Sequence, residues 1–403
     1  MKKIRLGLLP RILIAILLGV VWGLFSPIWL VRVFVTFNTL FGEFLGFSIP
    51  LIILGLVTVS IAEIGSGAKS MLMLTTAVAY GFTLMSGFLS FFTGAAWFPH
   101  LIQSQSTSVY DAVGGELPAH FSVSIPPLMG VMTALVLAFM LGLGLASLHG
   151  GSMLKEAARD FQAIIVKTIE GVIIPLLPIY IFGVFLNMTA DGKVFGILLV
   201  FIKIIGVIFL LHIFVLLFQY VLAGLAVKRN PLKLLLTMLP AYFTALGTQS
   251  SAATIPVTLE QTKKNGVSAR IAGFVIPLCA TIHLSGSTLK IVACALALMV
   301  MQGIPYDFGL FAGFICMLGI AMVAAPGVPG GAIMASLGIL QSILGFDESQ
   351  QALMIALYIA MDSFGTACNV TGDGAIALII DKIAGRLTEE GDTLPSTTDC
   401  TDC

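Results

Sequence analysis

Long apolar segments follow one another along most of the chain, and they limit the fold more than any other feature of the sequence. A helix needs about 20 consecutive apolar residues to cross the hydrocarbon core of a bilayer. Eight segments are suited to this: an N-terminal run that ends at Leu30, then about 36–63, 69–97, 124–148, 158–187, 194–226, 269–302 and 350–385. Because a backbone in lipid must satisfy its own polar groups, the sequence predicts an all-α protein with eight transmembrane helices.

Composition excludes the soluble classes of protein. Of the 403 residues 58% are hydrophobic and 10% are charged, whereas soluble domains contain about 25% charged residues. The formal net charge is zero, so no basic patch supports a nucleic-acid partner. We therefore expect a multi-pass protein of the cell inner (plasma) membrane, surrounded by the lipid bilayer. The N-terminal run lacks a small-x-small cleavage site, so it is interpreted as an uncleaved first helix.

Lysine and arginine positions predict the orientation of the spans, because these residues are enriched in cytoplasmic loops. Lys2, Lys3 and Arg5 precede the first span and place the N-terminus inside. The long loop after the third span contains neither residue type and falls outside. Lys382 and Arg386 follow the eighth span. Both termini are therefore predicted to be cytoplasmic.

Two further apolar segments, about 234–264 and 308–345, are too rich in Gly, Ser and Pro to be regular helices. The first contains Thr248-Gln-Ser-Ser-Ala-Ala-Thr-Ile-Pro256, and the second contains Ala324-Ala-Pro-Gly-Val-Pro-Gly-Gly331. Irregular backbone at membrane depth persists only where it lines a cavity or is buried in protein. The flanking charges place the first segment on the inside and the second on the outside. The pattern favours two oppositely oriented re-entrant helical hairpins with inverted repeats over two kinked helices packed by small residues.

A polar stripe runs along the last apolar segment. Asp362, Thr366, Asn369 and Asp373 are spaced at i, i+4, i+7 and i+11, which places them on one face of an α-helix. An aspartate at membrane depth marks a substrate or ion site, since it needs a partner there. Two carboxylates, a hydroxyl and an amide on one face predict a site for an amine and a cation.

Together these motifs resemble the dicarboxylate/amino acid:cation symporter family, which has the glutamate-transporter fold. The resemblance covers the whole chain in topology and Tyr242 to Asp373 in motif. The matching stretches are Ser250-Ser-Ala-Ala-Thr-Ile-Pro-Val-Thr258, Pro277-Leu-Cys-Ala-Thr-Ile-His-Leu-Ser-Gly-Ser287 (family pattern P-L-G-A-T-I-N-M-D-G-T), Gly327-Val-Pro-Gly330 and 362–373.

The resemblance implies a homotrimer that works by elevator-type alternating access. Spans one, two, four and five would form a scaffold. The chain would divide into 1–230, mainly scaffold but including the transport spans 69–97 and 194–226, then a transport core at 231–386 and an acidic cytoplasmic tail at 387–403.

The resemblance also implies roles for individual residues. An amino acid substrate would be held by its carboxylate and its amine, and sodium ions would be held largely by backbone oxygens. The substrate residues would be Ser250, Ser251 and Asn369 for the carboxylate, Asp362 and Thr366 for the amine, and Val328 and Gly330 as the cover. The sodium residues would be Asp373 with backbone oxygens near Cys279, His283 and Asn369, and, for a second ion, the carbonyl of Thr281 with those of the second hairpin.

Two departures from the family pattern concern specificity. Gly365 stands where members that carry acidic substrates have an arginine, and Gln249 replaces the arginine before the hairpin serines. An arginine binds a side-chain carboxylate through paired hydrogen bonds, which glycine cannot do. We expect a small neutral amino acid such as serine, threonine or alanine, with Ser287 offering a hydroxyl near the substrate. A dicarboxylate is the alternative.

Three residues of the unwound seventh span concern the coupling ion. Ser285 replaces a sodium-binding aspartate of the family pattern and His283 replaces an asparagine. Sodium at Asp373 is the favoured coupling. His283 could instead carry a proton, or remain neutral and hydrogen-bonded. Lys290 is interpreted as a fixed counter-charge to a site carboxylate, with Asp373 the natural candidate, or as a residue that snorkels out of the bundle.

Two other classes of protein fit the sequence less well. An ion channel would show charged rings or a carbonyl filter in place of an amine and cation stripe. An intramembrane hydrolase built on Ser251 and His283 would need a G-x-S-x-G or HExxH motif, and the sequence contains neither. The sequence therefore predicts a secondary transporter, not an enzyme.

Overall fold

The computed structural model describes residues 8–64, 69–102, 117–148, 152–190, 192, 194–323, 325 and 329–391, and within these ranges the regular structure is helical. Six helical stretches are long and apolar enough to cross a membrane: Ile28–Val59, Met71–Ile102, Met153–Ala190, Leu198–Val227, Ala269–Gln302 and Asp362–Ala384. The all-α prediction is confirmed. The other two predicted spans form shorter apolar helices, so the count of eight crossings remains a prediction.

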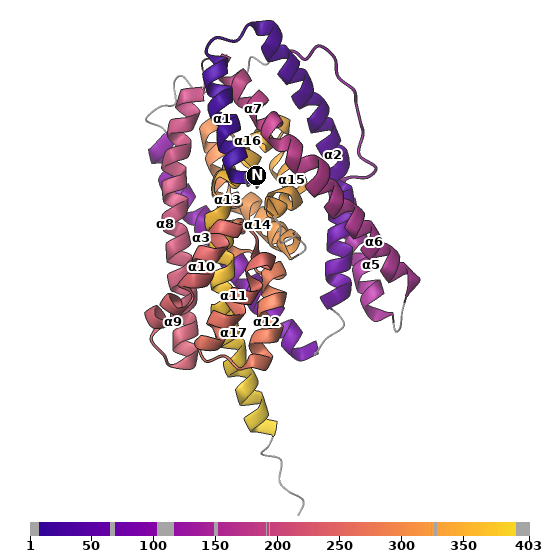
Figure 1. Cartoon of the computed structure of the whole chain (residues 1–403). Helices are drawn as coiled ribbons and strands as arrows, with labels where there is room; N and C mark the ends of the chain where they lie inside the picture. Colours follow the sequence, from indigo (N-terminus) through magenta and orange to yellow (C-terminus); the bar gives the residue numbers. More distant parts are fainter. Residues whose placement is uncertain are drawn as a thin grey trace, which may run out of the picture.

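One group of helices comes from the first, second, fourth and fifth predicted spans. It consists of α1 (Leu8–Gly23), α2 (Ile28–Ile64), α5 (Val131–Ser147), α6 (Met153–Thr168), the π-helix η3 (Ile169–Ile173) and α7 (Ile174–Ala190). Helix α2 packs against α5, α6 and α7, and α1 packs along α7. Figure 1 shows α2, α5 and α6 gathered at the right of the view.

Three predicted boundaries in this group differ most from the structure. The second helix begins at Ile28 and not at 36. The first helix ends at Gly23, before Leu30, because Pro27 precedes the start of α2 and has no N–H with which to continue α1. The fourth helix begins at Val131 and not at 124, because Pro126 and Pro127 keep the preceding backbone out of the helical region.

The remaining helices form a second group, at the centre and left of Figure 1. Helix α13 packs against α3 and α17, and α17 also packs against α8, α10, α11 and α12. The members are α3 (Lys69–Ile102), α8 (Val194–Val227), α9 (Pro231–Thr237), α10 (Leu239–Thr248), α11 (Ser251–Lys264), α12 (Ala269–Ile282), α13 (Ser285–Gln302), α14 (Phe308–Met322), α15 (Gly331–Leu344), α16 (Glu348–Ala360) and α17 (Asp362–Gly391).

Two of the predicted spans are interrupted. The seventh is split into α12 and α13 at His283 and Leu284, whose backbones leave the helical region (φ −103°, ψ 98° and φ −122°, ψ 44°). The eighth, predicted as one helix over 350–385, is split at Met361 into α16 and α17. Asp362 therefore lies at the first residue of a helix instead of inside one.

Both irregular segments form helical hairpins. Helices α10 and α11 pack together and are joined at Gln249 and Ser250, where Gln249 takes a left-handed conformation (φ 54°). Helices α14 and α15 also pack together, and Gly330 (φ 76°) precedes α15. Glycine suits this position because a Cβ disfavours positive φ. In Figure 1, α10 and α11 lie below α15. Re-entry from opposite membrane faces remains a prediction.

Candidate functional site

The polar stripe predicted from the sequence lies on α17, inside the second group of helices. Asp362, Thr366, Asn369 and Asp373 are all buried in this one helix. Helix α17 packs against α13, whose residues from Ser285 to Met299 are all buried. The stripe therefore faces protein, as polar groups at membrane depth require.

Asp362 is bound from two other elements. The Nζ atom of Lys290 on α13 lies 3.1 Å from Asp362 Oδ1, and the backbone N–H of Gly330 donates to Oδ2 at 2.9 Å. The Lys290 side chain is 0% exposed, and its Nζ lies 3.5 Å from the centroid of the Tyr358 ring. A single carboxylate thus connects α17, α13 and the tip of the second hairpin.

The partner predicted for Lys290 was wrong. Asp373 was the natural candidate, but the structure pairs Lys290 with Asp362 and pairs Asp373 with His283. The reason is that α13 and α17 run antiparallel. His283, just before α13, contacts Asp373, and Lys290, further along α13, contacts Asp362 at the start of α17. Because Lys290 is fully buried, it also does not snorkel.

Gly286 and Gly365 allow α13 and α17 to approach closely. A Cβ at Gly286 would lie 2.6 Å from the carbonyl oxygen of Gly365, and a Cβ at Gly365 would lie 2.6 Å from both Cε and Nζ of Lys290. Small residues at a helix contact permit such an approach in membranes. Residue 365 is an uncharged glycine, but the ammonium of Lys290 on α13 lies beside it.

Asn369 ties the middle of α17 to α13. Its Oδ1 accepts from the backbone N–H of Gly286 at 2.8 Å, and its Nδ2 donates to Ser287 Oγ at 3.1 Å. Ser287 Oγ also lies 3.0 Å from the hydroxyl of Tyr358. The predicted substrate residues Asn369 and Ser287 are therefore in direct contact. Tyr358, which touches both Ser287 and Lys290, was not identified from the sequence.

Asp373 lies at the break between α12 and α13. Its Oδ1 is 2.9 Å from the ring nitrogen Nδ1 of His283. The backbone N–H of His283 donates to the Cys279 carbonyl oxygen at 2.9 Å. Gln219 of α8 lies on the other side of the imidazole, with its Nε2 3.4 Å from His283 Nε2 and 3.2 Å from Ser285 Oγ. Both ring nitrogens of His283 thus have neighbours, and the structure brings together the predicted residues Cys279, His283 and Asp373.

One oxygen near His283 could serve a hard cation, which prefers oxygen ligands. Gln219 Oε1 is buried and has no hydrogen-bond partner among the described residues. The described ranges contain no cluster of three or more His, Cys, Asp or Glu side chains that could hold a metal ion. A cation here would therefore need amide and backbone oxygens in addition to the Asp373 carboxylate.

Gln219 and His212 were missed by sequence reasoning, although their spacing carried a signal. They are seven residues apart, a spacing that places both on one face of the otherwise apolar helix α8. His212 Nε2 lies 3.1 Å from the carbonyl oxygen of Gly286, and Gln219 contacts Ser285. This face of α8 borders the start of α13.

The first hairpin approaches the start of α17. Ser250 caps α11, accepting from the N–H of Ala253, and Ser251 is buried. Gln249 Nε2 donates to Ser363 Oγ at 2.8 Å, next to Asp362. Of the other predicted residues, Thr281 is exposed and its hydroxyl donates to the Leu278 carbonyl, and Val328 lies outside the described residues.

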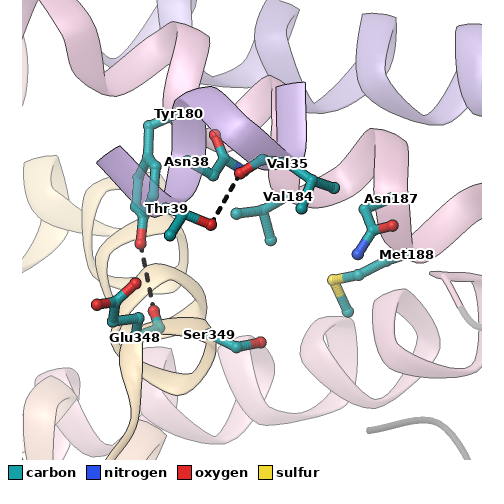
Figure 2. Close-up of a pocket in the computed structure, with 9 residues that line it drawn as sticks. All are labelled: Val35, Asn38, Thr39, Tyr180, Val184, Asn187, Met188, Glu348 and Ser349. Atoms are coloured by element: carbon teal, nitrogen blue, oxygen red, sulfur yellow. Dashed lines mark hydrogen bonds between the residues drawn. The ribbon is translucent and has the colours of Figure 1, made fainter. Parts of the chain in front are cut away.

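A pocket of about 130 Å³ lies apart from these residues, where α16 meets α2 and α7. Figure 2 shows Tyr180 of α7 reaching toward Glu348 of α16, whose carbonyl oxygen accepts from the Tyr180 hydroxyl at 3.2 Å. Asn38 and Asn187 also line the pocket. This polar pocket lies between the two groups of helices.

The chain is similar in sequence to known transporters. The chain is 26% identical to a serine/threonine transporter SstT of Acinetobacter baumannii over 94% of its length and 97% of that protein. It is 29% identical to the SstT of Streptococcus suis over 82% of its length and 93% of that protein. It is 31% identical to excitatory amino acid transporter 3 of Mus musculus over 42% of its length and 32% of that protein. The pattern of the sodium:dicarboxylate symporter family matches residues 8–383, so the protein belongs to this family and is a multi-pass membrane transporter, not an enzyme.

Proposed function

We propose that this transporter takes up a small neutral amino acid together with sodium. The observation that carries the proposal is the buried stripe on α17, where Asp362 and Asn369 lie two turns apart and contact the second hairpin and α13. A carboxylate suits an ammonium group, and an amide donor suits a carboxylate. The serine/threonine transporters among the relatives support the same substrate class.

In this proposal the substrate carboxylate is bound by Ser250, Ser251 and Asn369. Asp362 and Thr366 bind the amine, Ser287 lies near the substrate side chain, and Val328 and Gly330 cover the bound molecule. Closure of the second hairpin has a local basis in the structure, since the Gly330 N–H donates to Asp362. A hairpin tip that contacts the amine-binding residue can respond to what that residue binds.

Sodium binds in this proposal at Asp373, with backbone oxygens of Cys279, His283 and Asn369, and a second ion binds at the Thr281 carbonyl. The buried oxygen of Gln219 near His283 supports a cation in this region. Proton coupling is a second candidate, and the contact of His283 with Asp373 favours it, because both side chains can bind a proton. We prefer sodium to a proton as the coupling ion, because the proposed ligands at Asp373 are oxygens, which sodium prefers.

We further propose that transport moves one group of helices against the other. Helices α1, α2, α5, α6 and α7 would form a scaffold and the contacts of a homotrimer, and the second group would carry the substrate as in other inverted-repeat transporters. The packing of each group supports this division. In this scheme both termini lie in the cytoplasm, and the two hairpins enter the membrane from opposite faces.

Competition of radiolabelled serine uptake into proteoliposomes tests the substrate class. We expect L-serine, L-threonine and L-alanine to inhibit, and L-aspartate and L-glutamate to inhibit far more weakly. Gly365 and Gln249 carry no charge, so a side-chain carboxylate of the substrate meets no arginine at either of these positions. Submillimolar inhibition by aspartate, with none by serine, threonine or alanine, would contradict the proposal.

A further inference from the structure

The amine site proposed at Asp362 already contains an amine of the protein itself. Both carboxylate oxygens of Asp362 are bound, one by Lys290 Nζ and the other by the Gly330 N–H. Lys290 ends in a primary ammonium, the same chemical group that an amino acid presents. A substrate amine and the Lys290 ammonium therefore compete for one carboxylate.

The pair is built into the fold and is not a chance contact. Lys290 is 0% exposed, and Gly365 leaves the space that Cε and Nζ occupy. The ammonium also has two other neighbours: the Tyr358 ring, with a centroid 3.5 Å away, and the Met361 carbonyl oxygen, also at 3.5 Å. An ammonium released from Asp362 would keep these neighbours, since a cation over an aromatic face is stabilised.

We propose that Lys290 is an internal counter-cation that alternates with the substrate amine at Asp362. This inference rests on the proposed transport of amino acids. When a substrate binds, its amine takes Asp362, and the Lys290 ammonium stays with its other neighbours, the Tyr358 ring and the Met361 carbonyl oxygen. When the substrate leaves, Lys290 returns to Asp362.

The physical reason concerns the return of the carrier without substrate. Net uptake requires the transport unit to cross back with Asp362 still buried, and an unpaired carboxylate at membrane depth is strongly unfavourable. Lys290 neutralises it without a second ion from solution. Exchange of external for internal substrate has no such step, because the carrier moves inward and outward with a substrate amine bound at Asp362.

The two transport modes give the test. Net uptake of radiolabelled serine into empty proteoliposomes is compared with exchange into vesicles loaded with serine. Lys290→Ala is expected to lower net uptake by more than about tenfold, the effect of an uncompensated buried charge, while exchange stays within about twofold of wild type. Ethylammonium added to both sides should restore net uptake of Lys290→Ala, because it supplies the missing ammonium.

Matched variants separate this role from a structural one. Lys203→Met removes an exposed lysine of α8 that donates to the Leu101 carbonyl, and both modes should be unchanged. Gly365→Ala keeps Lys290 but displaces its ammonium, because the added Cβ would lie 2.6 Å from Nζ. It should give the same selective loss of net uptake. Gly273→Ala on α12, where a Cβ meets open space, is its control.

The outcomes are distinct. Equal loss of net uptake and exchange in Lys290→Ala, or no loss of either, would overturn the role of Lys290. If Lys290→Ala does not fold, Gly365→Ala decides by the same criterion. A wild-type protein that exchanges no neutral amino acid would overturn the proposed function itself, and the inference would fall with it.

Discussion

Asp362→Asn is expected to weaken amino acid binding by more than about tenfold and to destabilise the protein. The substitution keeps the shape of the side chain but removes the charge that would bind the substrate amine, an interaction of roughly 2–5 kcal/mol in a desolvated site. It also leaves the buried ammonium of Lys290 without its partner, at a cost of about 3–5 kcal/mol. Calorimetry measures the binding, and thermal unfolding in detergent measures the stability.

A double variant separates the two effects. Lys290→Met together with Asp362→Asn removes both members of the buried pair, so no unpaired charge remains. Removing both charges avoids the cost of one unpaired buried charge, about 3–5 kcal/mol. We therefore expect the double variant to recover most of the lost thermal stability but not the binding of serine. Unchanged serine affinity in Asp362→Asn alone would place the amine site elsewhere.

Asp373→Asn is expected to abolish the dependence of serine binding on sodium. In the proposed function Asp373 is the carboxylate that binds sodium, since serine stands at position 285, where the resemblance implies the other carboxylate. The asparagine can still contact His283 through a hydrogen bond, so the loss should reflect charge and not local unfolding. Titration of sodium against serine binding, followed by thermal shift, measures the effect.

Two companion variants identify the coupling ion. His283→Asn removes the imidazole, and if His283 carries a proton it should shift the driving force from a pH gradient towards sodium. Lys290→Met should leave the apparent sodium affinity in the exchange assay unchanged, because Lys290 pairs with Asp362 and not with Asp373. Serine uptake driven by a proton gradient in sodium-free buffer would contradict sodium coupling.

The candidate site was only partly visible in the sequence. Asp362 and Asp373 stood out as carboxylates in an apolar segment, and the helical spacing that joins them to Asn369 is a local property that α17 confirms. Gln219 was not identified; its spacing from His212 placed the two on one face of a helix, but the residues which that face contacts, Ser285 and Gly286, lie on another helix. The sequence also gave no sign that Lys290 fills the space beside Gly365, because these residues lie on different helices.

By itself, the sequence determined the all-α membrane class, the helical hairpins at the irregular segments and the polar stripe on one helix. These follow from hydropathy, proline and glycine positions and the helical period, which act over neighbouring residues. Only the tertiary structure decided that Lys290 meets Asp362 while His283 meets Asp373. The relative register of two packed helices depends on the breaks at Leu284 and Met361 and on close approach at Gly286, and no local pattern encodes it.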